Sequence, residues 1–368
     1  MIDFRINRFF EPGVVPKPGR HAVREFHRGL PGYEVTPLHR CRGLGRTLGL
    51  AGLLVKDESQ RFGLEAFKAL GAAWAMERLR NGRAAAGTFV TATDGNHGRA
   101  VAWAARRLGG EAVIFIPAHS APARIEKIRR EGARVELVEG TYDKAVAMAE
   151  AAGRRHGWQV VADTGYSGYL DIPEWIVEGY ATLFEEAAEQ IEAGGDEPPD
   201  VVLVQAGVGS LLQAAVDHFR GFEKQPRLVA VEPVESNALF TSIGSVDGAA
   251  TPSAGKQNSI MAGLNCGEVS LAAWPTVRRG VELFLTIDDG YAAAAMRRLA
   301  RPAEGDPPIT AGESGAAGLA GLLALLEEPR LAPAKQFLGL GPRSTVLVIN
   351  TEGATDPVGY DRIVSGKR

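Results

Sequence analysis

Lys68 lies at the start of a segment predicted to be helical, and its sequence neighbours are mostly apolar. Arg61 and Arg78 are the nearest basic residues along the chain. A lysine in apolar surroundings has a lowered pKa, and its amine can then form a Schiff base with an aldehyde such as pyridoxal phosphate. Most such lysines are surface residues whose stems cover apolar side chains, and this segment alone favours that alternative. Further segments shift the balance towards chemistry.

The segment Gly207-Val208-Gly209-Ser210 follows a predicted strand at residues 201–204 and precedes a predicted helix at residues 211–220. Glycines let the backbone approach a ligand, and a helix N-terminus favours anions, so the pattern is typical of a phosphate site. The alternative is an ordinary turn in which Ser210 caps the helix. The segment lacks the third glycine and the later acidic residue of the dinucleotide fingerprint.

Asp94, Asn96 and His97 also lie among glycines between a predicted strand, residues 88–91, and a predicted helix, residues 96–108. Asn96 could donate a hydrogen bond to a ligand oxygen, and Asp94 could be a base. His97 could be a base or a polar residue of the first helical turn. The alternative is a capped helix, with Asp94 or Asn96 as the N-cap.

Asp163 and Thr351 each follow a predicted strand, at residues 159–162 and 345–349. Open α/β sheets bind ligands at the carboxyl ends of their parallel strands, where a carboxylate could act as a base and a hydroxyl could reach a ring nitrogen. Local capping, for Asp163 an Asx-turn, is the alternative for both.

The elements that position these residues alternate between strand and helix, which favours an α/β fold with a largely parallel sheet. Residues 237–275 show little periodicity, and we expect them to be mostly loop. The chain has 368 residues, enough for two domains and a large core.

Composition excludes several classes of function. The net charge of -3 gives no electrostatic support for nucleic acid or an anionic membrane as a partner. Cys41 and Cys266 have no partners at metal-site spacing, so we expect no metal and a reducing compartment. The N-terminus is charged where a signal peptide is apolar, and no apolar run approaches membrane-spanning length. We therefore expect a cytoplasmic protein without a membrane partner.

The chemical segments, in this order, resemble the fold-type II family of pyridoxal-phosphate enzymes, which includes serine and threonine dehydratases. Within the family they are most similar to the ammonia-lyases that act on 2,3-diaminopropionate. The resemblance runs from about Phe26 to Asp356, and its Asp94 segment is specific because dehydratases usually carry Ser-Gly-Asn there. It rests on five segments: residues 26–38, residues 56–64, residues 93–99, residues 261–268 and residues 351–353.

The resemblance implies an α/β fold of two open, twisted, mostly parallel sheets flanked by helices. A small α/β domain, residues 87–176, would be inserted in a large cofactor-binding domain, residues 1–86 and 177–368. The implied activity is α,β-elimination of ammonia from D- or L-2,3-diaminopropionate, a step of amino-acid degradation giving pyruvate and two ammonia. A homodimer acting on a small amino-acid substrate is also implied.

The resemblance assigns roles to individual residues. Lys68, with Phe67 beside it, would hold pyridoxal 5'-phosphate as a Schiff base, Asn96 would bind its phenolic oxygen, and Thr351 would face its pyridine nitrogen. Asp94 would be the base for the D-substrate and Asp163 the base for the L-substrate. The residues that would hold the phosphate are Gly207, Val208, Gly209 and Ser210.

Two departures from the family pattern flank the expected site. Glu65 stands where asparagine is expected, and Gly165-Tyr166-Ser167 replaces an expected Ala-Trp-Glu. Because both departures flank the expected active site, the resemblance predicts cofactor binding more firmly than substrate preference.

Two alternatives stay open. A serine or threonine dehydratase of the same fold needs only one base, and Asp94 argues against it. The second alternative is a catalytically silent pyridoxal-phosphate-binding protein, and the presence of Lys68, Asp94 and Asp163 together argues against it.

Overall fold

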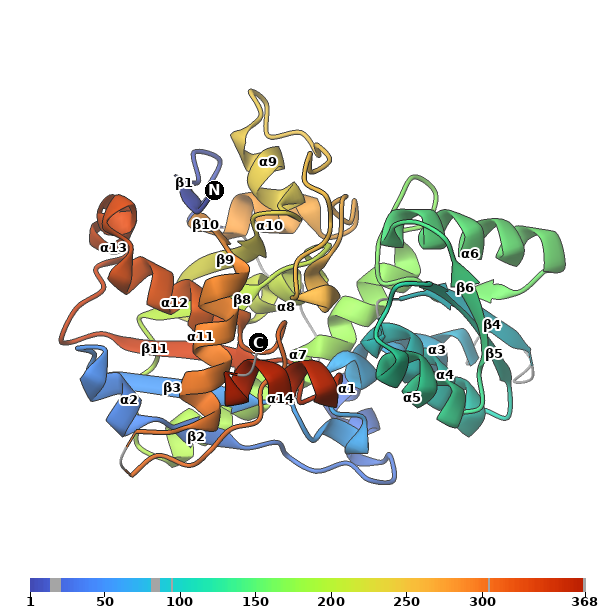
Figure 1. The fold of residues 1–368 in the computed structure, drawn as a ribbon, viewed down its shortest axis with the longest axis horizontal. Helices are drawn as coiled ribbons and strands as arrows, with labels where there is room; N and C mark the ends of the chain where they lie inside the picture. The colour runs from blue at the N-terminus through green and yellow to red at the C-terminus, as the bar shows by residue number, and fades with distance from the viewer. Residues whose placement is uncertain (14–20, 81–86, 94, 304, 367–368) are drawn as a thin grey trace.

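The computed structural model describes residues 1–13, 21–80, 87–93, 95–303 and 305–366. Its strands form two separate sheets, one on each side of the molecule in Figure 1. The seven strands of the larger sheet are β1 (Asp3–Ile6), β2 (Leu38–Arg40), β3 (Gly52–Asp57), β8 (Val201–Gln205), β9 (Arg227–Pro233), β10 (Leu283–Ile287) and β11 (Thr345–Asn350). The four strands of the smaller sheet are β4 (Thr88–Ala92), β5 (Glu111–Pro117), β6 (Arg134–Val138) and β7 (Gln159–Val160).

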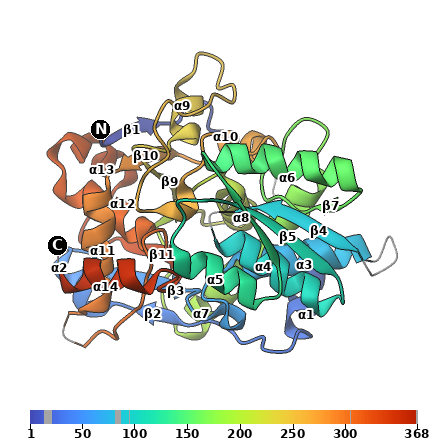
Figure 2. The same ribbon diagram turned by 45° about the vertical axis from the view of Figure 1, so that its right-hand side comes forward.

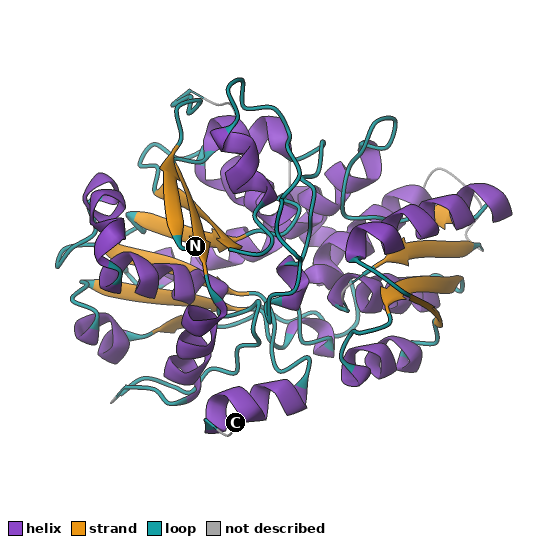
Figure 3. Ribbon diagram, turned by 45° about the horizontal axis from the view of Figure 1, so that its top comes forward, coloured by secondary structure: helices purple, strands orange, loops and turns teal. Residues whose placement is uncertain are grey.

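Helices cover both sheets, as the ribbon coloured by secondary structure shows (Figure 3). In the first half of the chain they are α1 (His21–Arg28), α2 (Arg42–Thr47), η1 (Arg61–Gly63), α3 (Lys68–Arg80), α4 (Asn96–Arg107), α5 (Pro122–Arg130), α6 (Tyr142–His156) and α7 (Asp171–Ala193). In the second half they are α8 (Ser210–Phe219), α9 (Ala238–Gly244), η2 (Ala262–Leu264), α10 (Trp274–Gly280), α11 (Asp289–Ala300), α12 (Ala317–Glu327), η3 (Pro329–Leu331), α13 (Ala332–Leu338) and α14 (Pro357–Ser365).

The larger sheet has the order β1-β10-β9-β8-β11-β3-β2 and is parallel except at its two edge strands. Its central strands are buried on both faces, which explains why they read as continuous apolar runs. In the register, Val348 of β11 lies between Leu203 of β8 and Val55 of β3. The carboxyl ends of β8 and β11 therefore lie side by side, which brings together the segments that follow them.

The smaller sheet has the order β6-β5-β4-β7 and is parallel throughout. Helices α4 and α5 lie on one side of it and α6 on the other (Figure 2). The segments after β4 and β7, which carry Asn96 and Asp163, leave neighbouring strands of this sheet in the same direction. Both sheets therefore direct strand ends towards the region where the predicted site residues meet.

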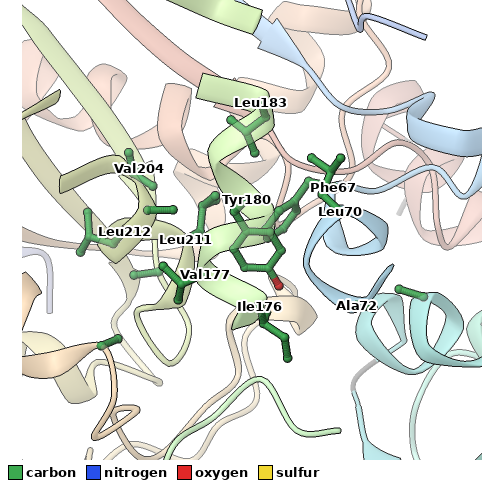
Figure 4. Close-up of a cluster of buried hydrophobic side chains, with 14 of the residues drawn as sticks. Phe67, Leu70, Ala72, Ile176, Val177, Tyr180, Leu183, Val204, Leu211 and Leu212 are labelled. Carbon is green, nitrogen blue, oxygen red and sulfur yellow. The ribbon is translucent and has the colours of Figure 1, made fainter. Parts of the chain in front are cut away.

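The long helix α7 packs between the two sheets. Its Tyr180, with the ring centroid 4.7 Å from that of Phe67, lies in a buried cluster with Leu70 and Leu183 (Figure 4). At the crossing of α3 and α7, a Cβ added to Gly179 would lie 2.6 Å from the Cα of Gly71. The two helices touch backbone to backbone there, and this contact fixes the start of α3, where Lys68 lies.

A buried ionic cluster ties β3 and η1 to the same helix. Lys56 Nζ lies 2.8 Å from Oε2 of Glu186, and Arg61 bridges Glu186 and Glu58 through hydrogen bonds of 2.7–2.9 Å. Its side chains are fully buried, and although burial alone would raise the pKa of Glu186, Arg61 and Lys56 hold it below its usual range. Removing one partner would leave an uncompensated buried charge, so the cluster fixes the register of η1 against α7.

The α/β fold and the predicted strand–helix alternation are confirmed, with boundaries that differ by a few residues. The alternative in which Ser210 caps the following helix does not hold, because Gly209 is the N-cap and Ser210 is the first helical residue. Residues 237–275 are mostly loop, as expected, but α9 lies at their start and α10 begins at Trp274. The predicted domain limits remain a prediction, and the one at residue 176 falls inside α7.

In the part of the chain that the structure describes, no helix is long and apolar enough to cross a membrane. The same residues contain no group of three or more histidine, cysteine, aspartate or glutamate side chains placed to hold a metal ion. Cys41 and Cys266 are both buried and form no disulfide.

Candidate active site

A pocket lies where the segments following β4, β7, β8 and β11 meet the start of α3. It gathers nearly every site residue that the sequence predicts, from segments as far apart in the sequence as Phe67 and Thr351. Its lining consists of Phe67, Lys68, Thr93, Asn96, His97, Tyr142, Asp163, Gln205, Ala206, Gly207, Val208, Gly209, Ser210, Leu211, Gly263, Leu264, Cys266, Ser314, Thr351 and Glu352. Asp94 lies outside the described residues, so its predicted place in this pocket stays a prediction.

Lys68 is the first residue of α3, and its Nζ lies 2.5 Å from Oδ2 of Asp163. Burial alone would lower the pKa of Lys68, but the carboxylate of Asp163 outweighs it and raises the pKa above its usual range. The sequence interpretation expected a lowered pKa for this lysine, and the paired carboxylate is the reason why the direction is reversed. Before any Schiff base forms, the amine is therefore a protonated partner of Asp163.

Asp163 is held from several sides. Burial alone would raise its pKa, but the charge of Lys68, and then the hydrogen bonds from Lys68 and Tyr142, hold the pKa well below its usual range. Tyr142 of α6 donates to Oδ1 at 3.2 Å, and Ser210 donates to the backbone carbonyl of Asp163 at 2.8 Å. The carboxylate thus points at Lys68 instead of closing an Asx-turn, and Ser210 connects it to the glycine segment.

The glycine segment offers unused backbone donors to the pocket. Among the described residues, the N–H groups of Gly207, Val208 and Gly209 donate to no acceptor within the protein. Gly209 has φ of 101°, which favours glycine, and a Cβ on Gly207 would lie 3.0 Å from the Sγ of Cys266. Consecutive N–H groups ahead of the N-terminus of α8 form a concavity suited to an anion such as a phosphate.

Asn96, the first residue of α4, donates through Nδ2 to Oε2 of Glu352. Glu352 is 2% exposed and also accepts from the backbone N–H of Ser314 at 3.1 Å. This bond orients the Asn96 side chain so that its amide nitrogen lies in the pocket. The second N–H of that nitrogen can then donate to a ligand oxygen. Asn96 is not the helix cap, because Gly95 is the N-cap and the hydroxyl of Thr93 accepts from the N–H of Gly98.

Thr351 follows β11, and its hydroxyl accepts a hydrogen bond of 3.0 Å from Nε2 of Gln205. Its backbone carbonyl accepts from the N–H of Phe67 at 3.2 Å. These two contacts connect the end of β11 to the end of β8 and to the residue before Lys68. The hydroxyl lies in the pocket and is not a helix cap.

Glu65, the first departure from the family pattern, has a left-handed backbone conformation. Its φ of 59° is left-handed, a conformation that asparagine adopts more readily than most residues other than glycine, so the expected asparagine has a physical reason. The Glu65 carboxylate instead accepts from Lys127 at 2.6 Å and Arg99 at 3.1 Å. Both cations belong to helices over the smaller sheet, so Glu65 ties those helices to the segment before Lys68.

The second departure has a steric cause. A Cβ added to Gly165 would lie 2.8 Å from that of Ala272, so the loop after Asp163 could not hold the expected alanine without moving. The ring of Tyr166 instead stacks on that of Tyr169 with centroids 4.8 Å apart.

Several pocket residues were not predicted. Tyr142 opens α6, a helix with no motif, and Gln205 is the last residue of β8. Glu352 stands next to Thr351, and its acidic side chain at a strand end was a signal that could have been used. Tyr142 and Gln205 become recognisable as pocket residues only when segments far apart in the sequence are brought together.

Comparisons with known proteins give a consistent family. The family model described as "Pyridoxal-phosphate dependent enzyme" matches residues 30–351. A diaminopropionate ammonia-lyase of Salmonella typhimurium is 40% identical, over 94% of this chain and 91% of its own length. One of Escherichia coli strain K12 is 39% identical, over 99% of this chain and 96% of its own length.

Solved structures agree with the sequence relatives. The crystal structure of the diaminopropionate ammonia lyase from Escherichia coli, in complex with an aminoacrylate-PLP azomethine reaction intermediate, superposes with a TM-score of 0.92. The identity is 38%, and the match covers 100% of this chain and 98% of that one.

Proposed function

Since this chain belongs to the pyridoxal-phosphate dependent enzyme family, we propose that it eliminates ammonia from 2,3-diaminopropionate, giving pyruvate and two ammonia. The observation that carries the proposal is the pair of Lys68 and Asp163, with a cofactor-anchoring amine and a base 2.5 Å apart. The relatives that match nearly the whole chain carry the name of this activity.

The pocket fits pyridoxal 5'-phosphate. The amine of Lys68 would hold the cofactor, and the unused N–H groups of the segment from Gly207 to Ser210 would bind its phosphate. Asn96 has one N–H left for the phenolic oxygen, and the Thr351 hydroxyl would face the pyridine nitrogen. Phe67 lies beside Lys68, with its ring centroid 5.3 Å from Nζ.

The chain's own residues supply binding and proton transfer. When bound, the cofactor withdraws electrons from the Cα atom of an amino acid and makes its proton acidic. Asp163 is ionised and lies in the pocket, so it can accept that proton once Lys68 no longer occupies it. The amino group on Cβ leaves as ammonia when it departs protonated, and the released 2-aminoacrylate hydrolyses to pyruvate and a second ammonia.

Asp163 is assigned to the L-substrate and Asp94 to the D-substrate. A base on each face of the substrate would explain the acceptance of both enantiomers, whereas a serine or threonine dehydratase needs one base. The support for Asp94 is its place in the sequence, next to Gly95 and Asn96.

We further propose that the enzyme works as a homodimer in the cytoplasm. Symmetric dimers are the commonest assembly of soluble proteins. Two buried cysteines that form no disulfide are compatible with a reducing compartment.

The test is pyruvate formation from D- and L-2,3-diaminopropionate, compared with D- and L-serine and L-threonine, with pyridoxal phosphate added. Fast turnover of both diaminopropionate enantiomers and slow turnover of serine are expected. Turnover of serine or threonine alone would identify a dehydratase instead, and no turnover of any of them would favour a silent binding protein.

A further inference from the structure

His97 lies in the first turn of α4, and its side chain is 4% exposed. It lines the pocket beside Asp163, yet the proposed reaction gives it no task. A buried imidazole at the edge of a proton-transfer site is a costly residue unless its hydrogen bonds are used.

The hydrogen bond at Nε2 fixes the tautomer. Nε2 lies 2.8 Å from the backbone carbonyl of Val161, which can only accept, so Nε2 carries the hydrogen. Burial, opposed by Asp163, lowers the pKa of His97 below its usual value, so the ring is neutral at neutral pH. In a neutral ring with its hydrogen on Nε2, Nδ1 presents a bare lone pair.

That lone pair faces Asp163. Nδ1 is buried and has no hydrogen-bond partner among the described residues, and it lies 3.9 Å from Oδ2 of Asp163. Two acceptors face each other while Asp163 is ionised, because neither carries a proton to share. A protonated Asp163 would be a donor at the same place, and a small rotation of the carboxyl would close the distance.

We propose that His97 is a positioning residue that accepts a hydrogen bond from Asp163 after Asp163 has taken the proton from Cα of the L-substrate. The proton leaves Cα, resides on the carboxyl of Asp163 and is shared with Nδ1, and it then departs from Asp163 to the leaving nitrogen or to water. His97 stays neutral throughout. This inference rests on the proposed function, since it needs Asp163 to be the base.

The consequence is a stronger base. An acceptor that favours the protonated carboxyl raises the proton affinity of Asp163 when the substrate is bound, while Lys68 and Tyr142 keep it ionised beforehand. Among the charged groups, Asp163 and Lys68 act on His97 electrostatically. The titratable groups that line the pocket with His97 are Lys68 of α3, Tyr142 of α6, Asp163, Cys266 and Glu352.

The first test is independent of activity. In cofactor-free protein labelled with ¹⁵N-histidine, NMR should show His97 with its hydrogen on Nε2 and a bare Nδ1 at neutral pH, assigned by the signals lost in His97→Gln. In Asp163→Asn the new amide can donate where the protonated carboxyl would, so the Nδ1 resonance should move towards a hydrogen-bonded value. A hydrogen on Nδ1, or an Nδ1 resonance that Asp163→Asn leaves in place, would overturn the proposal.

The second test is kinetic. His97→Gln keeps an amide that can donate to Val161 and removes the acceptor facing Asp163. It should lower kcat for the L-substrate by about ten- to a hundredfold and move the acidic limb of the kcat profile about one pH unit lower. The D-substrate should be affected less. Equal losses on both enantiomers with an unmoved acidic limb would mean that His97 has a structural role only.

The two proposals fail in different ways. If Asp163→Asn keeps full turnover of the L-substrate, Asp163 is not its base and the proposed reaction scheme fails. If Asp163→Asn is inactive but the His97 resonances do not respond, only the role of His97 fails. A thermal melt shows whether His97→Gln is folded. If it is not folded, the NMR spectrum of Asp163→Asn still tests the proposal, because the Nδ1 resonance of one histidine among the seven should move.

Discussion

The amine of Lys68 and the carboxylate of Asp163 lie 2.5 Å apart although 95 residues separate them in the sequence. Each determines the ionisation of the other, because the pair keeps the amine protonated and the carboxylate charged in a buried site. Engagement of the Lys68 amine by the cofactor would take it out of this pair and leave the Asp163 carboxylate available for proton transfer. The ion pair thus keeps Asp163 ionised until Lys68 binds the cofactor.

Asparagine at either proposed base should separate the two enantiomers. Asp163→Asn should lower kcat for L-2,3-diaminopropionate by about a hundredfold or more and affect the D-substrate less, because an amide cannot accept the Cα proton. Asp94→Asn should do the reverse. Pyruvate formation with each variant and each enantiomer measures both effects, and equal losses on the two enantiomers would refute the assignment of one base to each.

Alanine at Gly209 should weaken cofactor binding. The φ of 101° is unfavourable for any residue with a Cβ, so Gly209→Ala should cost about 1–3 kcal/mol and shift the N–H groups ahead of α8. Titration of the cofactor-free variant with pyridoxal phosphate, followed by its visible absorbance, should give a raised Kd. Gly339→Ala is the matched control, since Gly339 has a φ of 65° and nothing within 4 Å of an added Cβ, and it ends α13. The interpretation is wrong if both variants bind the cofactor like the wild type.

Glu65 should contribute to stability through its two cations. Glu65→Ala removes the contacts to Lys127 and Arg99 and does not relieve the left-handed backbone conformation at this position. It should therefore lower the free energy of unfolding by about 1–2 kcal/mol. Glu65→Asn should lose less, because asparagine tolerates the backbone conformation. Urea denaturation measures both variants.

Glu126→Ala is the control for Glu65. Glu126 pairs with Arg130 on the exposed side of α5, where an ion pair contributes little, so the change should stay within about 0.5 kcal/mol. If both Glu65 variants are as stable as the wild type, the contacts of Glu65 with Lys127 and Arg99 contribute nothing to stability.

Glu313 should make stability fall as pH rises. Burial, assisted by Glu352 and opposed by Arg124, raises the pKa of Glu313 to about 7. The folded state then binds the proton more tightly than the unfolded chain, whose carboxyl has a pKa of about 4.3. The contribution is full below the unfolded pKa and is lost as pH rises through about 7.

Glu313→Gln isolates that contribution because glutamine does not ionise. The free energy of unfolding of both cofactor-free proteins is measured with urea at mildly acidic and at mildly alkaline pH. Between these two conditions the wild type should lose on the order of 3 kcal/mol more than the variant. Parallel stability curves for the two proteins would contradict the raised pKa.

The segments that carry the site could be predicted because they follow a local rule. Each of these segments stands where a strand ends or a helix begins: Lys68, Asp163, Gly207–Ser210 and Thr351. Parallel strands bring such ends to one edge of a sheet. Buried parallel strands such as β8 and β11 also have unmistakable apolar runs. The motif residues and the fold class were therefore accessible from the sequence.

Other features depend on contacts that no local pattern contains. β1 is a strand because Asp3 pairs with Thr286 of β10, and the short β2 likewise depends on its pairing with β3. Tyr142 joins the site only because α6 ends up beside the loop after β7. The pKa of Lys68 was predicted in the wrong direction for the same reason, since the carboxylate that reverses it is distant in the sequence.

Chemical trapping of the cofactor tests the central claim most directly. The holoenzyme is reduced with borohydride, digested and analysed by mass spectrometry, with Lys68→Ala treated in parallel. The account predicts a pyridoxyl-phosphate adduct on the peptide that contains Lys68, and no adduct and no turnover in Lys68→Ala. An adduct on another lysine, or full turnover by Lys68→Ala, would contradict it.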